Sequence, residues 1–200
     1  MGSGKSTVVE NIAAALPDCE ALHEDDFNRT TERSLDDIDA WWGRGAIVGE
    51  LDLSELIKQL AIMCPDKVSC VTGSAQKSRR STTRILLLET HFGRLHPALE
   101  PWIDYQCWID VPADIAVARK IVQLCGHMRS QPANSDNKYG SELRWIENFC
   151  KGYLTTTRKL FEMQRQKVRE LSEMSIDGQG TPLAVCEAFL RHLPQRFKPE

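Results

Sequence analysis

The residues best suited to chemistry lie at the amino end of the chain, in the sequence GSGKST. Glycines let a backbone turn so that successive N–H groups point inward toward an anion, and a following helix adds its positive end. In such a loop Lys5 reaches the β- and γ-phosphates of a nucleotide, and Ser6 places its hydroxyl on Mg²⁺. The residues predicted to bind ATP are Gly2, Ser3, Gly4, Lys5, Ser6 and Thr7.

This motif is only the second half of the phosphate-loop pattern GxxxxGK[ST], whose first glycine would lie before Met1. The same residues satisfy an N-myristoylation pattern with Gly2 as the acceptor, and Met-Gly-Ser can also be the remnant of an expression tag. A dinucleotide-binding fingerprint fails, because Thr7 stands where its third glycine or alanine is required. We favour the phosphate loop because later segments supply the other parts that such a loop needs.

Those parts are acidic and cationic side chains in a fixed order. A hydrophobic strand ending in an acid should lie beside the loop to hold the metal or its water, and RILLLE ends in Glu89. A second acid should accept the proton of the reacting hydroxyl within hydrogen-bond reach, and HEDDF supplies Asp25. A cationic segment should close over the phosphates, and Arg119 and Arg129 flank a polar loop where one is expected.

The elements that position these residues alternate between strands and helices. Apolar runs predict strands at 21–23, 84–89, 107–112 and 175–177. Helical spacing predicts helices at 5–16, 36–42, 51–63, 113–124, 141–174 and 182–193, with a polar loop at 126–140 and a solvated basic loop at 67–84. The sequence therefore predicts an α/β fold with a parallel sheet and helices on both faces, in one domain over 1–200 with a small lid at about 119–140.

Composition narrows the partners and the compartment. The net charge of −3 gives no basic field for a nucleic-acid backbone, so no nucleic-acid partner is expected. No apolar run reaches the ~18–20 residues of a membrane span, so no membrane association is expected. The seven cysteines are scattered with no CxxC pair, and no secretory leader precedes them, which favours reduced thiols in a cytoplasmic protein. The oligomeric state is unassigned.

Taken in chain order, the motifs resemble those of the uridine kinase and nicotinamide riboside kinase group of P-loop kinases. EDDF resembles the family's QDxF pattern, which implies that Asp25 sits against the hydroxyl to be phosphorylated. DDIDAW resembles a segment whose leading aspartate holds sugar hydroxyls, which implies that role for Asp36. ILLLE resembles the Walker B strand, so Glu89 inherits the metal role. WIDVPADIAVARK resembles the strand and helix that lead into the lid.

The chain also departs from the family pattern. Glu24 replaces the usual glutamine, Thr90 replaces a glycine, and VTGSAQKS lacks the Pro-x-Tyr-Asp element that grips a nucleoside base. Trp41, with its neighbour Trp42, either walls a substrate pocket or belongs to the core.

The resemblance implies transfer of the γ-phosphate of ATP, with Mg²⁺, to a hydroxyl on a small metabolite, with a nucleoside or riboside as the leading candidate. The alternatives are a sugar or vitamin-precursor kinase and a nucleotide-binding module that has lost turnover.

In folds of this kind the strand before the phosphate loop lies in mid-sheet, beside the Walker B strand. A chain that began at Met1 would leave an open slot between strands, and each buried unpaired backbone group on its rims would cost ~1–3 kcal/mol. We therefore expect an upstream segment of one strand plus a glycine in the natural chain, and the alternative is a short form that is real and inactive.

Overall fold

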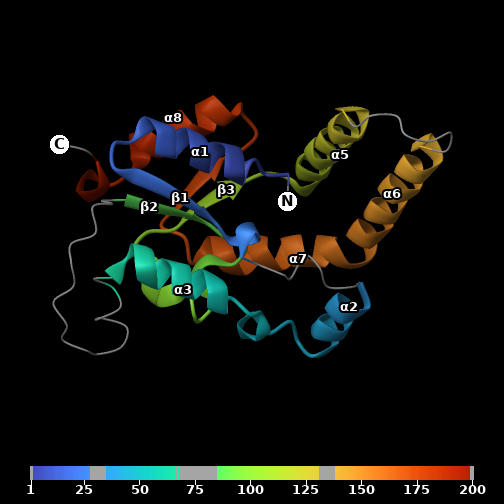
Figure 1. The fold of residues 1–200 in the computed structure, drawn as a ribbon, viewed down its shortest axis with the longest axis horizontal. Coiled ribbons are helices and arrows are strands. Elements are labelled where there is room, and N and C mark those ends of the chain that lie inside the picture. The colour runs from blue at the N-terminus through green and yellow to red at the C-terminus, as the bar shows by residue number, and fades with distance from the viewer. Residues whose placement is uncertain (1, 28–34, 66, 68–84, 131–137, 199–200) are drawn as a thin grey trace.

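A computed structural model describes residues 2–27, 35–65, 67, 85–130 and 138–198 (Figure 1). These residues form an α/β architecture in which the strands lie between two layers of helices. Helices α1 (Lys5–Ala15) and α8 (Pro182–His192) lie on one side, and α3 (Ser54–Met63) and α7 (Arg158–Met163) lie on the other. The predicted placement of helices on both faces is therefore confirmed.

The first half of the fold is a parallel strand pair that follows α1. The backbone leaves α1 at Pro17 and turns through Asp18, whose φ is 52°, into β1 (Cys19–His23). Strand β2 (Ile85–Glu89) pairs with β1 in parallel, and the register sets Cys19 opposite Ile85 and His23 opposite Glu89. Both strands end at positions that the sequence predicted, and β1 begins two residues earlier than expected.

The second half contains a separate parallel pair. Strand β3 (Cys107–Asp110) pairs with β4 (Met174–Asp177), and Asp110 lies opposite Asp177 at the carboxyl end. The described strands thus form two sheets of two strands each, where the sequence predicted a parallel sheet with an open slot. Among the described residues no segment pairs with both β2 and β3, and this is why the two pairs are not joined.

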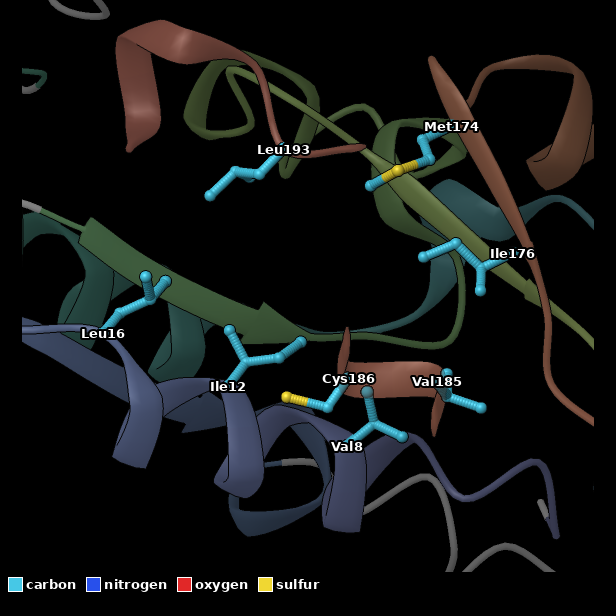
Figure 2. Close-up of a cluster of buried hydrophobic side chains, with 8 residues drawn as sticks. All are labelled: Val8, Ile12, Leu16, Met174, Ile176, Val185, Cys186 and Leu193. Atoms are coloured by element: carbon cyan, nitrogen blue, oxygen red, sulfur yellow. The ribbon is translucent and has the colours of Figure 1, made fainter. Parts of the chain in front are cut away.

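A cavity of about 670 Å³, lined mostly by apolar side chains and partly by charged ones, lies between the two pairs. Helices α1 and α8 close one side of it, and residues of α7 and of the turn after it close the other. Figure 2 shows the core around this space, with Leu193 and Ile176 opposite Ile12 and Leu16. The main core of the protein is therefore built around the cavity.

Two long helices project from this body (Figure 1). Helix α5 (Ala113–Ser130) follows β3, and α6 (Lys138–Gly152) follows the residues after α5. The sequence prediction ended the first of these helices at Leu124 and placed a loop at 126–140, so the helix is longer than predicted. Between Leu124 and Ser130 the one helix-breaking residue is Gly126, and a single glycine costs a helix only about 1 kcal/mol.

The predicted helix at 141–174 is also revised at its end. It is present as α6, a π-helical turn at Tyr153–Thr157, α7 and a second π-helical turn at Gln164–Val168. Met174 belongs to β4 instead, because Glu173 and Met174 donate backbone hydrogen bonds to the Gln106 carbonyl just before β3. No helix within the described ranges has an apolar stretch long enough to cross a membrane.

Gln106, directly before β3, joins three segments of the body. Its Oε1 accepts a hydrogen bond from the Arg94 N–H at 2.8 Å. Its Nε2 donates to the Val168 carbonyl at 3.0 Å and to the Ser172 hydroxyl at 2.9 Å. The side chain is buried, so each of these bonds replaces water that the folded protein excludes.

We therefore expect Gln106→Glu to lower the free energy of unfolding by about 2–4 kcal/mol, because a carboxylate offers no hydrogen to the Val168 carbonyl. Urea unfolding followed by circular dichroism measures this loss. The matched control is Gln123→Glu on the exposed surface of α5, where the side chain accepts from Lys120 and a change within about 0.5 kcal/mol is expected. Equal effects at the two positions would contradict a structural role for Gln106.

Candidate functional site

The amino-end turn adopts a backbone that requires glycine. Gly2 and Gly4 have φ angles of 67° and 77°, in the left-handed region that side chains disfavour. A Cβ on Gly2 would lie 1.9 Å from the carbonyl oxygen of Ala116, in the first turn of α5. The turn is therefore packed tightly against α5. It leads into α1, whose N-cap Gly4 offers no side-chain cap to the first N–H groups.

Three of the predicted site residues meet at this turn. The Ser6 hydroxyl donates to Glu89 Oε1 at 3.0 Å, and the Lys5 ammonium lies 3.9 Å from the same oxygen. Glu89 is the last residue of β2, and Ser6 is in the first turn of α1, 83 positions earlier in the chain. A cation, a hydroxyl and a carboxylate thus converge at the amino end of a helix.

His23 completes the surroundings of Glu89. Its Nδ1 lies 2.6 Å from Glu89 Oε2, and the β1–β2 register places the two residues directly opposite each other. Burial raises the pKa of Glu89, but the hydrogen bond from His23, the charge of Lys5 and the hydrogen bond from Ser6 outweigh it and lower the pKa below its usual value. Glu89 is therefore a carboxylate at neutral pH.

A second buried acid lies beside this group. Glu24 follows β1, is 1% exposed and accepts hydrogen bonds from the Thr90 hydroxyl at 2.5 Å and the His91 N–H at 2.8 Å. Burial raises its pKa, but the interactions with His91 and Thr90 prevail and lower it to about 2. Glu24 therefore fixes the turn after β2 to the end of β1.

Asp25, the predicted proton acceptor, lies next to Glu24 on the outer side. Its side chain is 56% exposed, and its Oδ1 lies 3.7 Å from Nδ1 of His91. Because parallel strands end at the same edge of a sheet, the residues after β1 and β2 gather there. The structure thus brings Asp25, Glu89 and the Gly4–Ser6 turn to one end of the molecule.

The two cationic residues predicted for the lid occupy different surroundings. Arg119 donates to the carbonyls of Gly178 at 2.8 Å and Gln179 at 2.7 Å, so its guanidinium holds the turn between β4 and α8. Arg129 is exposed near the end of α5, about 20 Å along the helix axis from Ala116 at about 1.5 Å per residue. Among the described residues, neither guanidinium forms a hydrogen bond or an ion pair with the Gly2–Thr7 segment.

Trp41 and Asp36 are the other two residues predicted to contact the acceptor. Trp41 is 4% exposed, and its Nε1 donates to the Ile47 carbonyl at 3.0 Å. It packs in a core cluster with Trp42, so the core alternative describes it better than a pocket wall. Asp36 lies in α2 (Leu35–Gly43), and its side chain is outside the described residues.

Two site residues were not predicted from the sequence. The sequence prediction assigned no functional role to His23 or to His91. Each histidine contacts an acid that comes from the neighbouring strand or from the turn after it, so only the strand register reveals the contact. The one signal available in the sequence was the position of each histidine in the chain: His23 comes directly before the acidic run, and His91 comes two residues after Glu89, which ends the strand.

The comparisons with known proteins add no relative to this picture. No protein-family model matches the chain, and no curated protein matches it either. The site is therefore interpreted from its own geometry.

The buried Glu24 predicts a pH-dependent stability. Its folded-state pKa of about 2 lies below the ordinary value of 4.5, so the ionised form stabilises the fold above pH 4.5 and this contribution is lost as the pH falls toward 2. We expect Glu24→Gln to lower the free energy of unfolding at pH 7 by up to about 3 kcal/mol and to flatten its decline between pH 4.5 and 2.

Urea unfolding at pH 7, 4.5 and 3 measures this effect. Glu187→Gln on the exposed face of α8 is the control and should follow the wild-type curve. A Glu24→Gln curve parallel to that of the wild type would refute the assignment.

Proposed function

We propose that the Gly2–Thr7 segment binds ATP with Mg²⁺, and that the protein transfers the terminal phosphate to a hydroxyl on a small metabolite. A nucleoside or riboside is the leading acceptor. The observation that carries this proposal is the convergence of Lys5, Ser6 and Glu89 at the uncapped amino end of α1. Phosphoryl transfer requires positioning and charge neutralisation more than covalent chemistry by the protein, so a small group of this kind suffices.

The positive groups at this end are complementary to the negative charge of a triphosphate. The Lys5 ammonium is one-quarter exposed and lies beside the first turn of α1, where backbone N–H groups favour anions. The left-handed glycines on either side of Ser3 let the backbone approach a phosphate without a Cβ in the way. These features support a phosphate site at the amino-end turn.

The same residues suit Mg²⁺ held together with a nucleotide. Mg²⁺ prefers oxygen ligands and usually takes one or two carboxylates plus substrate phosphates. Glu89 and the Ser6 hydroxyl would supply such oxygens, and the lowered pKa keeps Glu89 ionised. Within the part of the chain that the structure describes, no group of three or more His, Cys, Asp or Glu residues could hold a metal. A Mg²⁺ bound here would therefore take some of its oxygen ligands from the phosphates. The ion would neutralise charge on those phosphates.

Asp25 has the exposure that a general base for an external substrate needs. Its carboxylate faces solvent at the edge where Glu89 and Lys5 lie, and a base must come within hydrogen-bond distance of the acceptor hydroxyl. His91, 3.7 Å away, can orient this carboxylate. The acceptor itself is left open among nucleosides, ribosides, sugars and vitamin precursors, and a turnover screen over these alcohols identifies it.

Lys5→Met tests the nucleotide site. We expect it to weaken binding of ATP with Mg²⁺ at least about tenfold, because the variant loses the ammonium charge beside the phosphates. Isothermal titration calorimetry measures the affinity. Lys58→Met is the control, since Lys58 is exposed on α3 and pairs with Glu55, and it should bind like the wild type. Equal affinity in both variants would exclude the amino-end turn as the binding site.

Asp25→Asn separates a kinase from a binding module. We expect turnover to fall about 10²- to 10⁴-fold while the affinity for ATP stays within about twofold, because a general base acts on the acceptor and not on the nucleotide. Asp26→Asn, at the exposed neighbouring position, is the control and should keep its turnover. ATP binding without turnover in the wild type across the alcohol screen would favour the inactive nucleotide-binding module instead.

A further inference from the structure

Two arginines that the proposed transfer does not use line the same cavity as the candidate site. Arg158 begins α7, and Arg165 lies in the π-helical turn that follows it. Both side chains border the cavity, as do Lys5, Glu89 and His91. We call Arg158 and Arg165 the arginine pair. Two guanidinium groups thus share a cavity wall with the residues proposed to bind the nucleotide and the metal.

Two contacts fix the position of Arg165 relative to the site. Its neighbour Gln164 is buried and donates from Nε2 to the His91 carbonyl at 3.0 Å, and Nδ1 of His91 lies 3.7 Å from Asp25 Oδ1. Arg165 itself donates from Nη2 to Asp110, which ends β3, at 3.3 Å. Ligands of parallel α/β folds bind at the carboxyl ends of the strands. Arg165 is therefore held at the end of the molecule where Asp25 lies.

The helix predicted to contact the acceptor packs against the same segment. Helix α2 contacts the π-helical turn at Tyr153–Thr157, directly before Arg158. Trp41 of α2 also shares a buried core cluster with Met163 of α7. An acceptor that approaches Asp25 from the side of α2 would therefore lie beside the arginine pair.

Both guanidinium groups keep donors for an external ligand. Arg158 and Arg165 are exposed, and among the described residues each forms its hydrogen bonds through one nitrogen, Nε to Glu162 at 3.1 Å and Nη2 to Asp110. Guanidinium presents five N–H donors in a planar fork that fits a carboxylate or a phosphate. Exposed ion pairs of this kind are weak, so an anionic ligand competes with them.

We infer that the acceptor carries an acidic group, a carboxylate or a phosphate, which the arginine pair binds while the acceptor hydroxyl faces Asp25. This inference rests on the proposed function, and among the candidate alcohols it selects those that carry an acid. The γ-phosphorus of ATP loses its bond to the β,γ-bridging oxygen and gains one to the acceptor oxygen. The hydroxyl proton goes to Asp25, and ADP leaves.

The test compares matched alcohols that differ by one acidic group. The pairs are uridine with orotidine, glycerol with glycerate, and ribose with ribose 5-phosphate. Isothermal titration calorimetry measures each affinity for the 200-residue chain, alone and with a non-hydrolysable ATP analogue and Mg²⁺. In at least one pair we expect the acid to bind at least about tenfold more tightly than its neutral partner, because charge-assisted hydrogen bonds from a guanidinium are strong.

Arg165→Met should remove this preference. The affinity for the acid should fall at least about tenfold, while that for the neutral partner stays within about twofold. Arg169→Met is the matched control, since Arg169 is exposed and also pairs with Asp110, at 3.5 Å, but does not line the cavity. It should keep the wild-type preference. Arg158→Met tests the other member of the pair without removing a partner of Asp110 and should also weaken binding of the acid.

Three results would overturn the inference. The first is equal affinity for the acid and its neutral partner in every pair. The second is the same loss in Arg169→Met as in Arg165→Met. The third is weaker binding of the ATP analogue in Arg165→Met with no preference for acids, which would assign the arginine pair to the phosphates of ATP.

Failure of the proposed function gives a different result. Binding of an acid that depends on the arginine pair, in a chain that does not bind the ATP analogue, would refute the kinase and support the anion site.

Discussion

The candidate site depends on the parallel pairing of β1 with β2. Their register sets His23 beside Glu89 and carries Glu24 and Asp25 to the turn that follows β2. A shift by one residue would turn every side chain of one strand to the opposite face and separate these acids from the Lys5 end of α1. The hydrogen-bonded register of two five-residue strands therefore determines which charges meet.

The charges that meet there are balanced within the protein itself. Glu89 interacts with the Ser6 hydroxyl, the Lys5 ammonium and the His23 ring. Glu24 interacts with the Thr90 hydroxyl and with His91. Each buried acid thus has donors from a segment distant in the sequence, which compensates the cost of placing a carboxylate in the interior. A phosphate or a metal ion that binds at this site would replace some of these internal contacts, and the protein groups that it binds are already held in position.

Much of this arrangement could be predicted from the sequence because local patterns determine it. The apolar run before Glu89 identified β2, and the spacing of Val8, Ile12 and Leu16 identified α1. The convergence of Glu89 with Ser6 was expected because a phosphate loop needs a strand ending in an acid beside it. The continuation of α5 to Ser130 did not follow, because polar composition resembles a loop when the helix projects from the body and packs little of its surface.

The contacts that sequence patterns missed are those between segments far apart in the chain. The guanidinium of Arg119 illustrates this, since nothing near it in the sequence indicates that it binds the carbonyls after β4. This clamp also has a mechanical consequence. The first two turns of α5 are fastened to the body at Gly178 and at Gly2, so the projecting pair of helices cannot pivot at its base without breaking those contacts. A bend in α5 would therefore have to occur farther out along the helix, where Gly126 is the residue with the lowest helix propensity.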